Sequence, residues 1–330
     1  MRQPVFKTRI TELFGIDHPI LCGGLQWLAD AKYVAAVVNA GGMGFITCMS
    51  YPDDPEQFRR EVQKCHELTG GKPFGVSIPI SRRLGPNDRL KPYIDVIVEE
   101  RVKFIETSGD SPAVLLPRLK AAGCIVIHKA PTVRFAVSAQ KLDVDAVAVI
   151  AAESGGHPGT QMTPQIIQAP LAADAVTKPF ALGGGMSTGR HLVTSLAMGA
   201  DAILLGSRMV VAEEIWAHKN YKDHIVSIDE NANRVVMKIF KNHHRVLDNE
   251  TSRSVETLES EGVDDFNQYS QLTSGQLAKS AYANGDARTG MLDIGPSAVF
   301  AREVKSVEAI FDEIIDEAIL ASKRVAESHI

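Results

Sequence analysis

Apolar residues recur along the chain in short unbroken runs. Each run is followed by a turn rich in Gly, Ser, Thr or Pro and then by a segment with helical spacing. The runs predict strands over residues 19–24, 43–48, 74–78, 104–109, 125–130, 146–151, 179–185 and 202–207. Most of them are continuous rather than alternating in hydrophobicity, which is typical of parallel strands buried on both faces.

The segments between these runs carry the signals of helix ends. Residues 30–42 (DAKYVAAVVNAGG) end in glycines, residues 52–71 begin with acidic residues and end in Gly70 and Gly71, and residues 187–201 stop near Gly199. Eight βα units in 330 residues predict an α/β fold, a (β/α)8 TIM barrel. The competing architecture is a doubly wound open sheet, but the first turn, CGGLQW, lacks the GxGxxG signature of dinucleotide-binding sheets.

After the eighth run, the chain becomes polar and rich in Asn, Ser, Glu and Gln. Residues 210–296 are too many for one loop of a compact barrel, so we expect a small helical insertion domain after strand eight, with residues 231–246 (NANRVVMKIFKNHHRV) helical. Apolar residues at helical spacing return in residues 299–327, which predict the last barrel helix. The barrel domain is thus expected over residues 1–209 and 297–330.

Composition narrows the function classes. The formal net charge is −5 and no Lys/Arg-rich run appears, so nucleic acid is not an expected partner. The four cysteines stand singly, without zinc-ligand spacing, which indicates a reduced, cytoplasmic protein and no metal site. No run approaches eighteen apolar residues and the N-terminus has no signal-peptide core, so we expect no membrane partner.

In a parallel barrel the functional groups gather at the carboxyl ends of the strands. The seventh and eighth runs end in glycines that lead toward helix starts: Gly183, Gly184, Gly185, Gly206 and the neighbouring Ser207. Backbone N–H groups near helix N-termini bind phosphate, so both loops are predicted to hold one. The alternative interpretation, that these glycines only make tight turns, is weakened because both loops fall at the usual phosphate site of the fold.

Two further strand ends carry side chains suited to chemistry. Lys129 should point into the mouth of the barrel, where it would form a Schiff base, neutralise an anion or lie near a flavin ring, while His128 should face outward and be structural. His157 lies in the glycine-rich turn ESGGHPG (153–159), and an imidazole transfers protons near neutral pH. We therefore favour a catalytic role for His157 over a packing role.

Other polar residues are weaker candidates. Glu106 and Glu153 are possible general bases, although buried acids in barrels often brace a loop or a lysine instead. Gln26 and Trp27 in the first loop offer an amide and a stacking surface for a substrate pocket. His243 and His244 are adjacent in the expected helix, so they would face different directions and make a poor shared site.

An ordered set of motifs then carries a resemblance. CGGLQW, NAGGMGFIT, KPFGVSI, VIHKAPT, ESGGHPG, ALGGGMSTGR and GADAILLGSR follow one another along the chain, with LTSGQLAKSAYANGD near its end. Together they resemble the nitronate monooxygenase family of FMN flavoproteins, formerly called 2-nitropropane dioxygenases. The turn GGLQW and the strand VIHK are similar to the NAD(P)H:quinone reductase subgroup of that family.

The resemblance implies a TIM barrel, a helical insertion and non-covalent FMN, with roles carried over residue by residue. Gly23, Gly24 and Leu25 would lie along the isoalloxazine, Ser77 and Lys129 would contact the ring region, and Gly155 and Gly156 would approach its edge. The loops of Gly184, Gly185, Gly206 and Ser207 would hold the phosphate, and His157 matches the catalytic histidine of the family. Ser77 stands where the family usually has Asn, so a hydroxyl replaces an amide that reaches farther.

The sequence therefore predicts an FMN-dependent oxidoreductase with a small-molecule substrate. The first expectation is oxidation of alkyl nitronates or nitroalkanes with O2. The alternative is an NAD(P)H-dependent quinone or enoyl reductase, for which NADH or NADPH would be the co-substrate. A flavin-free barrel lyase or isomerase on a phosphorylated metabolite, using Lys129, is the third hypothesis. The sequence leaves a homodimer open.

Overall fold

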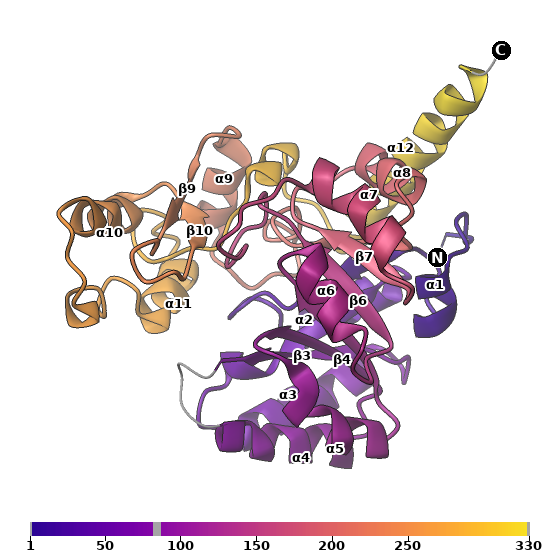
Figure 1. Ribbon diagram of the computed structural model, residues 1–330, viewed down its shortest axis with the longest axis horizontal. Helices are drawn as coiled ribbons and strands as arrows, with labels where there is room; N and C mark the ends of the chain where they lie inside the picture. The colour runs from indigo at the N-terminus through magenta and orange to yellow at the C-terminus, as the bar shows by residue number, and fades with distance from the viewer. Residues whose placement is uncertain (1, 82–86, 329–330) are drawn as a thin grey trace.

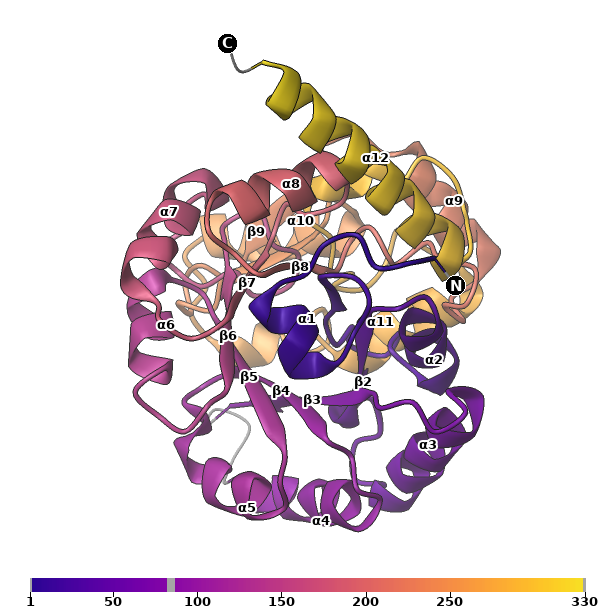
Figure 2. The same cartoon turned by 90° about the vertical axis from the view of Figure 1, so that its right-hand side faces the viewer.

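The computed structural model describes residues 2–81 and 87–328. Eight parallel strands close into a barrel in chain order, which confirms the predicted (β/α)8 TIM barrel (Figures 1 and 2). The strands are β1 (Ile20–Cys22), β2 (Met43–Thr47), β3 (Gly75–Ile80), β4 (Phe104–Gly109), β5 (Ile125–Ala130), β6 (Ala146–Ile150), β7 (Phe180–Gly183) and β8 (Ala202–Leu205). The glycines that the sequence pattern added to the ends of β1, β7 and β8 lie in the loops that follow, at the mouth of the barrel.

Helices surround the barrel between successive strands (Figure 2). They are α2 (Ala31–Asn39), α3 (Pro55–Leu68), α4 (Lys91–Glu99), α5 (Leu116–Ala121), α6 (Val133–Ala139), α7 (Gln165–Ala175), α8 (Gly189–Ala197) and α12 (Val307–Glu327), with short 3-10 turns η1 (Cys48–Ser50), η3 (Asn87–Leu90) and η4 (Pro112–Val114). Side-chain oxygens of Asp30, Asp54 and Thr188 accept hydrogen bonds from the first turns of α2, α3 and α8, which fixes where these helices begin.

The barrel interior is closed at its amino end. Leu21, Phe45, Phe104 and Leu204 belong to a buried interior cluster, and the short helix α1 (Arg9–Phe14) adds Phe14 to it. The Phe14 ring stacks on Phe104 with 5.0 Å between centroids, and α1 lies across the barrel axis in Figure 2. Since this plug fills the amino end, ligands have access from the carboxyl end.

The insertion follows β8 and lies at the end of the barrel opposite α1, where β9, β10, α10 and α11 are seen in Figure 1 and behind the strands in Figure 2. It contains α9 (Lys219–Ser227), β9 (Asn233–Val236), β10 (His244–Leu247), α10 (Glu250–Ser260), η5 (Phe266–Gln268) and α11 (Gly275–Asn284), and η6 (Pro296–Phe300) leads back to the barrel. Its separate apolar cluster is formed by Val236, Met237, Val246, Val255, Tyr269 and Met291. The domain limits at 210 and 296 stay a prediction. Tyr221 of α9, which lies within these limits, packs with the barrel core and not with the insertion cluster.

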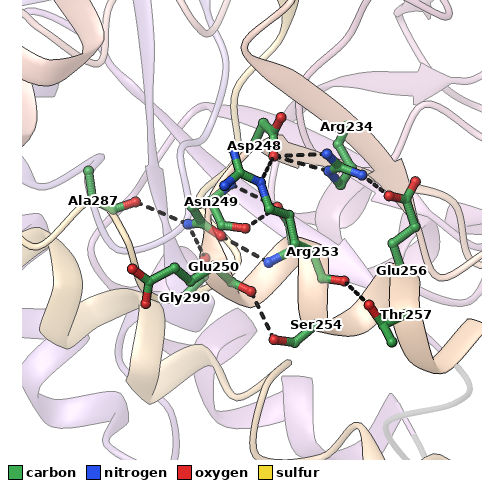
Figure 3. A network of polar contacts seen from close by, with 11 residues as sticks. Arg234, Asp248, Asn249, Glu250, Arg253, Ser254, Glu256, Thr257, Ala287 and Gly290 are labelled. Atoms are coloured by element: carbon green, nitrogen blue, oxygen red, sulfur yellow. Dashed lines mark hydrogen bonds and ion pairs between the residues drawn. The ribbon is translucent and has the colours of Figure 1, made fainter.

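The expected helix over residues 231–246 is wrong, because β9 and β10 form an antiparallel hairpin there. Val235 and Val236 are β-branched, and Met237 and Lys241 have φ of 62° and 51°, which a helix does not allow. Asp248, directly after β10, binds Arg234 of β9 and Arg253 of α10, and Asn249 donates to the carbonyls of Ala287 and Gly290 (Figure 3). This network holds the hairpin against α10 and the segment before residue 291.

The predicted last barrel helix is confirmed as α12. It packs across α8 so closely that a Cβ added at Gly189 would lie 2.2 Å from the carbonyl oxygen of Ile314, and its far end projects beyond the barrel in Figure 2. Within the described part of the chain, every helix falls short of the length and apolar character that a membrane-spanning segment needs.

Candidate active site

Three strands bring a buried carboxylate, a hydroxyl and an ammonium together at the barrel mouth. Glu106 on β4 is completely buried, and its Oε1 accepts from the Ser77 hydroxyl at 2.7 Å and lies 2.9 Å from the Lys129 ammonium. The Gly24 N–H also donates to this oxygen, at 3.1 Å. We call Ser77, Glu106 and Lys129 the carboxylate cluster. Lys129 thus points inward, as strand alternation predicts, while His128 lies behind it with its Nδ1 2.9 Å from the Thr107 hydroxyl.

The second oxygen of Glu106 has no hydrogen-bond partner among the described residues, although it is buried. A Cβ added at Gly23 would lie 3.0 Å from this oxygen, and one added at Gly24 would lie 2.4 Å from the Ser77 Cβ. No side chain fits at either glycine without displacing the cluster. Glu106 therefore braces the first loop and Lys129. This is the structural alternative to a general base that the sequence analysis gave for Glu106.

The loops after β7 and β8 present backbone at the mouth. Gly184 and Gly185 have φ of 88° and 77°, which favours glycine at both positions. A Cβ at Gly183 would instead meet Ile150 at 2.6 Å, so packing within the barrel explains that glycine. At Gly206 the nearest atom to an added Cβ is 3.9 Å away, on Leu25, which leaves space beside the loop. The Ser207 hydroxyl oxygen accepts from the Gly295 N–H at 2.8 Å and keeps its own hydrogen to donate.

The helix that follows β7 does not offer the free N-terminus expected from the sequence. The Gly189 N–H donates to Glu317 of α12 at 2.8 Å, and the N–H groups of Ser187 and Thr188 point to the His191 ring. These donors are already used. A phosphate at this end of the barrel would depend on the loop N–H groups of residues 184–185 and 206–207 instead.

The glycines of the sixth loop are required by contact with the insertion. Gly156, with φ of 77°, pairs with Arg245 of β10: its N–H donates to the Arg245 carbonyl at 2.9 Å and its carbonyl accepts at 2.7 Å. A Cβ at Gly155 would lie 2.8 Å from the carbonyl carbon of Ile294. The approach of these two glycines to a flavin edge stays a prediction.

His157 leaves this loop exposed at the surface and stacks on His244 of β10, with ring centroids 4.2 Å apart and planes 17° from parallel. His244 Nε2 lies 2.6 Å from Asp293 Oδ1. We call His157, His244 and Asp293 the histidine stack. The helical spacing of residues 231–246 placed His244 in a helix, so its contact with His157 was not predicted; Val235-Val236 and Val246-Leu247, on either side of residues 237–245, were the available hairpin signal.

Asp293 is ionised over the neutral range. Partial burial opposes ionisation, but the charge and hydrogen bond of His244 and the charge of His157 outweigh it and hold the pKa of Asp293 below its usual range. The stack therefore combines a carboxylate with two imidazoles beside the barrel mouth.

The remaining sequence candidates have structural partners. Glu153 accepts from the Gln165 N–H at 3.0 Å and caps α7, which favours the bracing role over the role of a general base. The Gln26 amide donates to the Met49 carbonyl at 2.9 Å. Trp27 has φ of 68°, an uncommon conformation for this residue type, and its carbonyl accepts from Trp216 at 2.7 Å while Lys279 of α11 lies 5.0 Å above its ring. A pocket role for Gln26 and Trp27 stays a prediction.

Two surface hollows lie elsewhere, of about 740 and 250 Å³. The larger is lined by α9 and residues 302–304, the smaller by α8 and α12, and in both of them basic and acidic side chains alternate. None of their lining residues belongs to the predicted cofactor set, and mixed charge favours neither anion nor cation. We therefore place the candidate site at the barrel mouth.

The mouth has the features that FMN requires. A planar ring needs backbone without side chains, which Gly23 and Gly24 supply, and its polar edge needs donors such as Lys129 and Ser77. The phosphate needs N–H and O–H donors with space beside them, which the loops of Gly185, Gly206 and Ser207 supply. The residues present fit the cofactor.

Comparison with known proteins agrees with this geometry. The family model described as "Nitronate monooxygenase" matches residues 7–91 and 80–317. A Rhodococcus jostii protein named "(3aS,4S,5R,7aS)-5-hydroxy-7a-methyl-1-oxo-octahydro-1H-indene-4-carboxyl-CoA dehydrogenase" is 31% identical over 252 residues, covering 76% of this chain and 68% of its own. A "Probable nitronate monooxygenase" of Staphylococcus saprophyticus is 26% identical over 353 residues, covering 94% and 98%.

Among solved structures, FabK from Thermotoga maritima superposes with a TM-score of 0.90 at 28% identity and covers 98% of this chain and 100% of its own. The family model and the relatives thus span nearly the whole barrel and the insertion. The chain belongs to the nitronate monooxygenase family and is an FMN-dependent oxidoreductase.

Proposed function

We propose that this enzyme oxidises or reduces its substrate at a carbon made acidic by a neighbouring nitro or acyl group, with His157 exchanging the proton at that carbon. The observation that carries the proposal is the place of His157, in the loop after β6 beside the FMN-compatible mouth, where it stacks on His244, which in turn contacts Asp293. An imidazole so placed can accept and return a proton near neutral pH.

The chain's own residues would hold the cofactor in three places. Gly23, Gly24 and Leu25 would lie along the ring, and Ser77 and Lys129, fixed by Glu106, would bind its polar edge. Gly155 and Gly156 would lie near the ring edge. The phosphate would be bound by the loops of Gly184, Gly185, Gly206 and Ser207, while Gly183, the last residue of β7, packs against Ile150. When bound, FMN supplies the electron transfer, and the protein supplies orientation and proton exchange.

Two substrate classes fit this chemistry. Nitronates and nitroalkanes are supported by the name of the family and by the staphylococcal relative. Acyl-CoA thioesters are supported by the relative named as a carboxyl-CoA dehydrogenase and by its Mycobacterium tuberculosis counterpart, 30% identical over 255 residues. The higher identity of these two relatives gives the thioester class the stronger support. NADH or NADPH as reductant and a quinone as acceptor remain proposals from the sequence alone.

One experiment separates these classes. The yellow holoenzyme is mixed without oxygen with propyl nitronate, a set of acyl-CoA thioesters, NADH and NADPH in turn, and loss of the flavin absorbance is followed. We expect a hydroxyacyl-CoA to bleach the flavin, or an enoyl-CoA to reoxidise it after NAD(P)H reduction; bleaching by propyl nitronate alone selects the nitronate class.

The role of His157 is tested by His157→Asn. We expect the variant to keep its flavin and to lose about 100-fold in the rate of the step that needs proton exchange, in line with general acid–base catalysis. His224→Asn is the matched control, because His224 is exposed in the last turn of α9. A His157→Asn variant that reduces its flavin at the wild-type rate with every active substrate contradicts the proposal.

A further inference from the structure

The insertion contributes side chains to the mouth that the barrel alone does not provide. Three stretches of chain run side by side there. Gly156 pairs with Arg245 through two backbone hydrogen bonds, Val246 forms a bridge with Asp293, and the Leu247 N–H donates to the Leu292 carbonyl at 2.8 Å. These pairings fix the register of the three stretches. His157 and His244 directly follow and precede the paired residues Gly156 and Arg245, and Asp293 is itself paired.

The three side chains of the stack contact one another in the order His157, His244, Asp293. His157 contacts His244 face to face at 4.2 Å, and His244 in turn contacts Asp293 through Nε2 at 2.6 Å. A carboxylate accepting at Nε2 requires a hydrogen on that nitrogen, so neutral His244 carries its proton on Nε2. The Asn242 amide lies 3.5 Å from Nε2 of His157, at the outer limit of a hydrogen bond.

Two charged residues close in the chain to the stack, Arg245 and Glu153, have partners outside it. The Arg245 guanidinium donates to the Ala152 carbonyl at 3.0 Å and to the Asn233 side chain, and Glu153 caps α7. Asp293 is the carboxylate that faces the two rings. His244 is also nearly enclosed, with 14% of its side chain exposed, so its ring has little freedom to turn.

From this geometry we infer that His244 and Asp293 of the insertion are positioning residues for His157: Asp293 fixes the tautomer and orientation of His244, and the His244 ring holds the His157 imidazole parallel to itself at the barrel mouth. The expected loss of kcat/KM rests on the proposed function of His157, whereas the expected change in histidine tautomer and ring signals does not.

The test uses FMN-loaded protein labelled with 15N-histidine. Ring 15N–1H correlations report the tautomer of each histidine, and kcat/KM over pH is measured with whichever substrate bleaches the flavin. Asp293→Asn is nearly isosteric, and His244→Phe keeps a stacking ring but removes the link to Asp293. Asp286→Asn is the control, because Asp286 pairs with Arg288 on the same insertion, in an exposed ion pair remote from His157.

We expect the wild-type His244 to show its proton on Nε2, and Asp293→Asn to show mixed tautomers and shifted His157 ring signals. Both Asp293→Asn and His244→Phe should lose about tenfold in kcat/KM, with an altered pH profile and unchanged flavin content. Asp293→Asn spectra and rates equal to those of Asp286→Asn overturn the inference. If His157→Asn is fully active, the role of His157 fails, while shifted His157 signals in Asp293→Asn still support the coupling.

Discussion

The two groups of polar residues at the barrel mouth are built in different ways. The carboxylate cluster comes from β3, β4 and β5, where Ser77 and Glu106 are register partners and Glu106 is fully buried. The histidine stack joins a barrel loop to two segments of the insertion, and His157 is exposed. The difference shows that one mouth can pair a buried group of side chains fixed by neighbouring barrel strands with an exposed group that depends on a smaller, separate core.

The largest effect is expected from removal of the carboxylate in the rigid side. Glu106→Leu leaves the Lys129 ammonium unpaired among buried groups, which should lower the free energy of unfolding by about 3 kcal/mol and abolish flavin binding. Urea unfolding and the flavin absorbance per protein measure both. Glu99→Gln, which breaks a surface ion pair with Arg59, should cost less than about 1 kcal/mol. Equal losses of unfolding free energy and flavin content in the two variants would contradict a special structural role for the carboxylate cluster.

A smaller effect should appear as acid sensitivity behind the same cluster. Burial, with a contribution from the Lys129 charge, lowers the pKa of His128 to about 4. Between pH 6.5 and 4 the unfolded chain therefore binds a proton at this residue that the folded chain does not, so stability falls as the pH falls through this window. His128→Gln should show a shallower loss of unfolding free energy between pH 7 and 4.5. An unchanged slope would assign the acid sensitivity to other groups.

The smallest effect is expected in the insertion. Burial alone would raise the pKa of Asp248, but the hydrogen bonds from Arg253 and Arg234 outweigh burial and lower it. The carboxylate therefore stabilises the fold above the usual pKa of a carboxyl, and this contribution is lost as the pH falls through the pKa of Asp248 in the folded protein. Asp248→Asn should cost about 1 kcal/mol at pH 7 and nothing near pH 2. Hydrogen exchange should quicken in β9, β10 and α10, the elements tied by the network of Figure 3, and not in the barrel strands. Faster exchange in the barrel would show that the two cores unfold together.

Sequence reasoning succeeds where the cause is local or periodic. Eight apolar runs predict eight barrel strands, and alternation along β5 places Lys129 inside and His128 outside. It fails where pairing is remote in the chain. The hairpin of β9 and β10 overrides the helical spacing of residues 231–246 because its valines fill a core completed by Tyr269 and Met291.

The same limit explains two errors in the site. Glu317 of α12 occupies the N–H of Gly189, which no pattern around α8 indicates. His244 joins His157 only because β10 pairs with the sixth loop. Each contact depends on segments more than 80 residues apart, which periodicity and spacing do not reach.

The joint between Gly156 and Arg245 is made by main-chain groups alone. Amide and carbonyl groups are the same in every residue, so a substitution at His244 would replace the side chain that His157 meets while these two backbone hydrogen bonds remain.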